Sequence, residues 1–72
     1  MNLILEYKGY KASIEYDEED NLFVGKVIGI YDLISFHGES IIEVEKNFRE
    51  SIDDYFEFCK EVGKIPDKPF EG

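Results

Sequence analysis

The sequence predicts an α+β fold in which an antiparallel sheet of three or four strands is covered on one face by one long helix, in the order β-β-β-β-α. Apolar and polar residues alternate through residues 3–17, as in strands with one solvent-exposed face. A short apolar run follows at residues 22–30. Apolar residues then recur at steps of three and four over residues 41–62, which is typical of a helix that packs on a sheet.

The length of the chain indicates one domain, which we expect to span residues 1–72. A chain of this size buries only about 60% of the surface that its unfolded form exposes, so its core must be small and rich in aromatic residues. The six Phe and five Tyr meet this need, and an apolar content of 43% is typical of a globular protein.

The first two strands are predicted at residues 3–7 and 10–17. Lys8 and Gly9 join them in a two-residue turn, where glycine can adopt a positive φ. The second strand ends in an acidic turn at residues 17–21, which leads to the third strand.

The third strand is predicted at residues 22–30 and is apolar on both faces, so we expect both of its faces to be covered. Gly25 and Gly29 indicate a close approach, a bulge or a bend. The two faces carry different residues: Phe23 and Val27 lie on one, and Val24, Ile28 and Ile30 lie on the other.

A short fourth strand is predicted at residues 33–36, and His37 and Gly38 lead out of it as a loop. The helix then begins at Ile41, because Ser40 and Glu43 form the capping-box pattern S-x-x-E.

Gly63 is the expected left-handed cap at the end of the helix, and Pro66 and Pro69 prevent it from resuming. Phe56 widens the apolar stripe and Phe58 lies off it. At about 1.5 Å per residue the helix spans roughly 33 Å, which is longer than the strands, so we expect its end to overhang the sheet. The stripe that we expect to face the sheet consists of Ile41, Val44, Phe48, Ile52, Tyr55, Cys59 and Val62.

The chain is strongly acidic, with 17 Asp and Glu against 8 Lys and Arg and a formal net charge of −9. This charge repels nucleic-acid phosphates and anionic lipid surfaces, so we expect neither as a direct partner. A basic protein is the better electrostatic match. Solubility alone also accounts for such a charge.

Catalytic and metal-binding patterns are weak, and we expect no enzyme activity, metal or cofactor. The acidic turn lacks the ligand spacing of an EF-hand loop. His37 is the only histidine and has no triad or metal partners in the sequence, and Cys59 lies on the buried stripe as an inert thiol. A two-metal nuclease site would have to draw on Glu6, Glu15, Asp17, Asp53 and Asp54.

No signal peptide or membrane-spanning run is present in the sequence, so we expect a cytoplasmic protein.

Three patterns stand out in the sequence, F-x-G-x-V-x-G-I, F-x-G-x-S and D-D-Y-x-x-x-C-x-x-x-G-x-x-P. They belong to a larger set of residues that is spread over nearly the whole chain: Tyr10, Glu15, Glu18, Asp20, Phe23, Gly25, Val27, Gly29, Ile30, Asp32, Leu33, Phe36, Gly38, Ser40, Phe48, Asp53, Asp54, Tyr55, Cys59, Gly63, Pro66, Lys68, Pro69 and Gly72. With this set the chain resembles the N-terminal domain of HicB-family antitoxins.

The resemblance implies a partial RNase H-like fold without nuclease activity. It also implies a role as the antitoxin of a type II toxin-antitoxin system, in which the domain covers the active site of a small basic HicA-type mRNA interferase. Members of the family commonly continue into a ribbon-helix-helix or helix-turn-helix domain, whereas this sequence stops at Gly72. We therefore expect no C-terminal DNA-binding domain and no DNA binding by these residues.

The surfaces for partners are expected in two places. One is the acidic rim that Glu15, Asp17, Glu18, Glu19 and Asp20 form, and the other is the overhanging end of the helix. We also expect a homodimer or higher homo-oligomer, because an apolar third strand and an exposed sheet edge favour self-association. A metal-dependent RNase H-like nuclease and a stand-alone structural or oligomerisation domain remain the alternatives. The predicted partner-binding residues are Glu15, Asp17, Glu18, Glu19, Asp20, Phe58 and Phe70.

Overall fold

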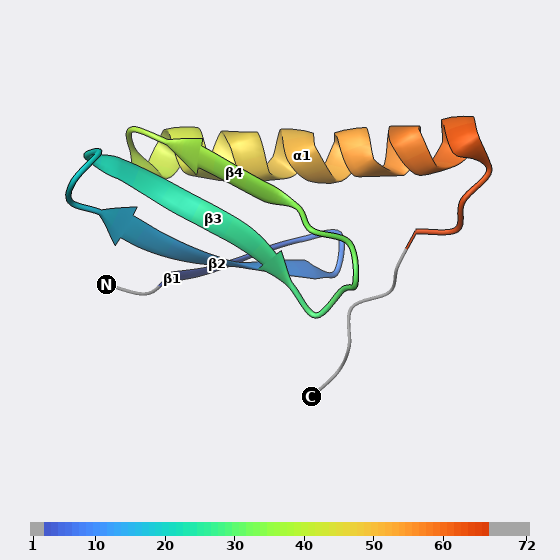
Figure 1. Cartoon of the computed structure of the whole chain (residues 1–72), viewed down its shortest axis with the longest axis horizontal. Helices are drawn as coiled ribbons and strands as arrows, with labels where there is room; N and C mark the ends of the chain where they lie inside the picture. Colours follow the sequence, from blue (N-terminus) through green and yellow to red (C-terminus); the bar gives the residue numbers. More distant parts are fainter. Residues whose placement is uncertain (1–2, 67–72) are drawn as a thin grey trace.

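The computed structural model describes residues 3–66 and confirms the predicted fold class. Four antiparallel strands form one sheet in the order β1-β2-β3-β4, and one helix packs along one face of it (Figure 1). The elements are β1 (Leu3–Tyr7), β2 (Tyr10–Asp17), β3 (Leu22–Ile28), β4 (Ser35–Gly38) and α1 (Ile41–Val62).

The β1–β2 hairpin closes through a two-residue turn. Lys8 and Gly9 both have positive φ, at 52° and 84°, and this left-handed pair matches the twist of the flanking strands. The register that results pairs Leu5 with Ala12, so alternate residues of both strands face the helix.

The core lies between α1 and one face of the sheet. Every strand contributes alternate side chains to this face, and α1 contributes a stripe at steps of three and four. The buried hydrophobic side chains are Tyr10, Ala12, Ile14, Val27, Phe36, Val44, Phe48, Ile52, Tyr55 and Cys59.

Gly25 is the point at which the sheet makes room for an aromatic ring. It pairs with Phe36 across β3 and β4, and an added Cβ would lie 2.2 Å from Phe36 Cε2 and 2.7 Å from Ile14 Cδ1. The Phe36 ring also stacks on Phe48 of α1, with centroids 5.3 Å apart. Of the close approach, bulge or bend that the sequence indicated at Gly25, the structure shows the close approach.

The limits predicted for the third and fourth strands were wrong. β3 ends at Ile28, because Gly29 adopts a φ of 80° and turns the chain out of the sheet. As a result Ile30 packs against the core and does not continue the open face. The fourth strand covers Ser35–Gly38 and includes His37, which we had placed in a loop.

Of the two faces of β3 that we expect to be covered, α1 covers one within this chain, and cover of the other by a partner stays a prediction. Val24 and Ile28 point to the face opposite α1 and are 41% and 40% exposed. One helix covers only one face of a sheet, so the second apolar face stays open in this chain.

The predicted limits of α1 are confirmed. Ser40 Oγ accepts a hydrogen bond from Glu43 N at 3.1 Å, and Gly63, with a φ of 74°, donates its N–H to Cys59 O. Val62, however, is 58% exposed and does not belong to the buried stripe, because the end of α1 extends past the sheet (Figure 1).

The start of α1 packs directly on β4. An added Cβ at Gly38 would lie 2.5 Å from Val44 N, so the helix backbone contacts the strand with no side chain between them. This contact determines which side of α1 faces β4.

We predict that Gly25→Ala lowers the free energy of unfolding by about 1–3 kcal/mol, because the added methyl overlaps the Phe36 ring and the core must shift. Urea denaturation measures the change. Gly63→Ala adds the same methyl without an overlap and should cost only about 1 kcal/mol, from the left-handed backbone. In a double-mutant cycle, Phe36→Leu should relieve part of the Gly25→Ala cost, and strict additivity would show that the added methyl does not act through the Phe36 ring.

Candidate functional site

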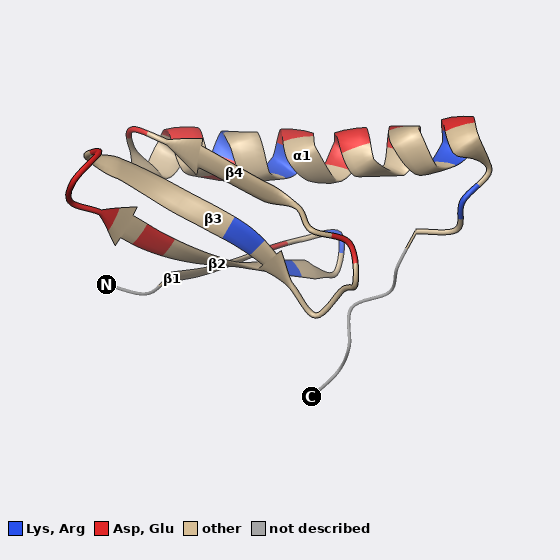
Figure 2. Ribbon diagram, in the orientation of Figure 1, with Lys and Arg blue, Asp and Glu red and all other residues tan. Residues whose placement is uncertain are grey.

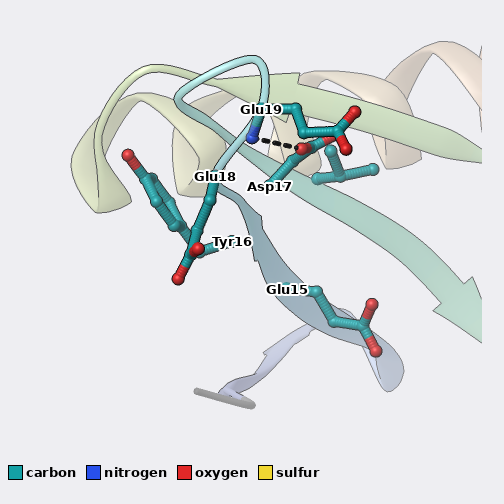
Figure 3. Close-up of a pocket in the computed structure, with 6 residues that line it drawn as sticks. Glu15, Tyr16, Asp17, Glu18 and Glu19 are labelled. Atoms are coloured by element: carbon teal, nitrogen blue, oxygen red, sulfur yellow. Dashed lines mark hydrogen bonds between the residues drawn. The ribbon is translucent and has the colours of Figure 1, made fainter.

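The acidic β2–β3 turn forms one end of the molecule, at the left in Figures 1 and 2. It borders an open depression of about 550 Å³, shown in Figure 3. The residues that line this depression are Glu15, Tyr16, Asp17, Glu18, Glu19 and Val24.

Asp17 has a structural role in this turn. Its Oδ1 accepts hydrogen bonds from Glu19 N at 2.9 Å and Asp20 N at 3.4 Å, which is how an Asp side chain closes a tight turn. Asn21 follows in a left-handed conformation and accepts a hydrogen bond from Tyr16 OH. The turn therefore holds its own shape.

The carboxylates around the turn do not converge on one point. Figure 3 shows Glu15, Glu18 and Glu19 pointing in different directions. Among residues 3–66, no three His, Cys, Asp or Glu side chains are grouped so that they could hold a metal ion. The turn is thus arranged as an exposed charged rim.

The predicted partner-binding residues fall into two separate groups. The five acidic ones lie at the end of β2 and in the β2–β3 turn, whereas Phe58, 56% exposed, lies near the C-terminal end of α1. Phe70 lies outside the described residues. The two groups therefore belong to separate surfaces, and their contact with a partner stays a prediction.

The five carboxylates considered for a nuclease site are also divided. Glu6, Glu15 and Asp17 lie on the open face of the sheet or at its end, by the alternation of β1 and β2. Asp53 and Asp54 lie on α1, on the other side of the sheet. The sheet separates the two groups.

A second acidic surface, which the sequence patterns above did not predict, runs along α1 on the side of β4. A depression of about 260 Å³ lies between them, lined by residues of both elements. The acidic residues of this side recur at steps of seven, four and seven, a spacing that could have been read from the sequence. We call Glu43, Glu50, Asp54 and Glu61 the acidic flank; all four are exposed, and the structure gives none of them an ion pair.

The opposite side of α1 carries paired charges. Lys8 Nζ lies 2.8 Å from Asp53 Oδ1 and over the rings of Tyr7 and Phe56, at 5.2 and 5.6 Å from their centroids. Tyr7 OH also donates to Asp53, at 3.1 Å. These contacts attach the β1–β2 turn to the helix.

The hydrogen bond between Lys8 and Asp53 shifts the pKa of both groups. The pKa of Asp53 is lowered from 3.8, chiefly by the hydrogen bond from Lys8; burial opposes this shift, and the hydrogen bond from Tyr7 and the charge of Lys8 lower the pKa further. The pKa of Lys8 is raised from 10.5 by the same bond. Both ionised forms are thus favoured by the folded state.

The C-terminal end of α1 is held by the loop between β3 and β4. Asp32 Oδ2 accepts a hydrogen bond from Tyr55 OH at 2.8 Å and forms an ion pair with Lys64. The overhanging end of the helix is therefore anchored to the sheet through Asp32, a role that the sequence did not reveal.

His37 and Cys59 offer no nucleophilic arrangement. The side chain of His37 is exposed on β4, and its backbone carbonyl accepts a hydrogen bond from Asn47 Nδ2 at 2.6 Å. Cys59 is 1% exposed in the core, where a thiol acts as a small apolar group.

No helix in the part of the chain that the structure describes combines the length and the apolar character needed to cross a bilayer. Comparisons of the chain with protein-family models, with curated proteins and with solved structures gave no match.

We predict that Asp53→Asn makes the stability of the domain less sensitive to acid. The pKa of Asp53 is lower in the folded than in the unfolded state, so its contribution is complete above about pH 4 and is lost as the pH falls through the folded-state pKa. Thermal unfolding measured from pH 7 to pH 2 should show a shallower acid decline in the variant. Asp54→Asn, which removes a neighbouring carboxylate without a hydrogen bond, should leave the decline unchanged.

Proposed function

We propose that this domain is an antitoxin-like protein-binding module that neutralises a small basic HicA-type mRNA interferase by covering its active site. The observation that carries the proposal is the distribution of unpaired acidic residues over two exposed surfaces, the β2–β3 turn and the acidic flank of α1 (Figure 2). Such surfaces favour association with a basic protein and disfavour nucleic acid.

The fold supports the structural half of the resemblance to HicB-family antitoxins. Gly25 admits the Phe36 ring, Gly38 admits the helix backbone, and Ser40 and Gly63 cap α1. Packing and capping explain why the motifs have these residues at these positions. The residues therefore agree with the β-β-β-β-α domain that the resemblance implies. The toxin-binding half of the resemblance is supported by the acidic surfaces.

We also propose that the domain has no enzyme activity of its own, binds no cofactor, and acts in the cytoplasm, where an mRNA-cleaving toxin would meet it. A metal-dependent nuclease is the less favoured function, because the sheet separates the carboxylates that such an enzyme would need.

Self-association is the second part of the proposal, as a homodimer or higher homo-oligomer. The open face of the sheet presents Ile4, Val24 and Ile28, each 40–54% exposed, and no described element covers them. Pairing two such faces would remove this apolar surface from water. A stand-alone oligomerisation domain would use the same face.

We predict that the domain binds a HicA-type toxin with an association rate that depends on salt. Raising the salt from low concentration to about 1 M, where the Debye length is about 3 Å, should slow association roughly tenfold or more. Stopped-flow titration measures the rate. A rate that salt does not change would remove the electrostatic part of the proposal, and absence of a complex would remove the function.

We predict that Val24→Lys weakens self-association roughly tenfold, the effect of losing about 1.4 kcal/mol of apolar burial. Sedimentation equilibrium measures the change. Ile42→Lys, at an 84% exposed position on α1, is the matched control and should leave the equilibrium unchanged. The open-face interface is contradicted if both variants self-associate like the parent.

A further inference from the structure

The outer edge of β4 is a free sheet edge within the described residues, since β4 is the last strand in the sheet order. Val27 N donates to Ile34 O at 3.0 Å, which fixes the alternation of hydrogen-bonded pairs between β3 and β4. By this alternation Phe36 bonds toward β3, whereas the backbone groups of Ser35 and His37 point away from it, toward the edge.

Asn47 shows how this edge accepts a donor. Its Nδ2 donates to the outward carbonyl of His37 at 2.6 Å, in the role that the N–H of an adjacent strand would take. The remaining outward groups are the N–H of His37 and both backbone groups of Ser35. They are the groups that an added strand would use.

The acidic flank of α1 lies directly beside this edge. Glu50 and Asp54 line the same depression as Ser35 and His37, so their carboxylates border the space next to β4. Phe58 follows Asp54 by one turn and adds an exposed apolar side chain to the same side of the helix. Lys46 lies one turn before Glu50, but the structure gives the two no ion pair, so the Glu50 carboxylate is available to a cation of a partner.

The negative charge of this surface favours a basic strand over a second copy of the chain. A second copy that paired β4 with β4 around a two-fold axis would place both helices on the same face of the joined sheet, with the flank residues Glu50 and Asp54 of each copy opposite one another. Like charges so placed repel. A basic strand would instead bring cations between the edge and the helix.

We propose that β4 and the acidic flank together bind an extended, basic segment of a partner protein by strand addition. The segment pairs with the outward backbone groups of Ser35 and His37, and its lysine or arginine side chains on the helix side contact Glu50 and Asp54. The inference rests on the proposed function in one respect, that the partner is a basic protein.

The probes for this surface are three blocked nine-residue peptides. One alternates threonine with lysine, the second alternates threonine with glutamate, and the third is the lysine peptide with alternate backbone amides N-methylated. In a titration of the ¹⁵N-labelled domain, the lysine peptide should shift the amides of Ser35 and His37 and slow their hydrogen exchange. The glutamate peptide should not bind, and N-methylation should abolish most of the protection because it removes strand donors.

Glu50→Gln combined with Asp54→Asn should weaken binding of the lysine peptide roughly two- to tenfold, the range expected for two exposed charge pairs. Glu18→Gln combined with Glu19→Gln is the matched control, because it removes the same charge from the distant β2–β3 turn; it should have a smaller effect. Equal effects of the two variants, or equal binding of the N-methylated peptide, would overturn the proposal. Shifts of Ser35 and His37 that grow with domain concentration alone would also overturn it, because a second copy would then occupy the edge.

Repeating the exchange measurement with a HicA-type toxin separates this inference from the proposed function. A toxin complex that leaves Ser35 and His37 unprotected would overturn the edge surface and support the toxin-binding function. Binding of the lysine peptide at the edge without binding of the toxin would support the surface and overturn the toxin as its partner.

Discussion

The packing of Phe36 is the interaction on which the rest of this fold depends. Its ring occupies the space that Gly25 leaves open on β3 and stacks on Phe48 of α1, so a single side chain joins two strands and the helix. Gly38, two residues later, lets the helix backbone contact the same strand. Together these contacts hold β4 and α1 side by side, and this places the acidic flank next to the sheet edge.

The second constraint is that one helix covers one face of a sheet. The core is complete on that face, whereas Val24 and Ile28 remain on the open face and Ser35 and His37 remain at the edge of β4. An acidic domain with an open apolar face and a charged edge is suited to contacts with other proteins. The proposed antitoxin role and the proposed strand addition both follow from this distribution of surfaces.

Local signals in the sequence were enough for the helix limits, because Ser40 and Gly63 act on their immediate neighbours. The end of β3 was not predicted, because Gly29 indicated a close approach, a bulge or a bend equally, and only the structure shows that its left-handed φ turns the chain out of the sheet. For the candidate site, the acids of the β2–β3 turn were found as a run. The ion pair of Lys8 with Asp53 joins residues 45 positions apart, so only the folded chain reveals it. The residues of the acidic flank recur at a helical spacing in the sequence, but only the structure shows that they lie beside β4.

Inhibition of RNA cleavage is the direct test of the proposal that this domain neutralises a basic ribonuclease toxin. A HicA-type toxin is incubated with a fixed amount of mRNA and increasing amounts of the domain, and the cleavage rate is measured. We expect a cleavage rate that falls in proportion to the added domain and reaches zero near stoichiometric amounts. Cleavage that continues unchanged at a large excess of the folded domain would rule out the antitoxin role.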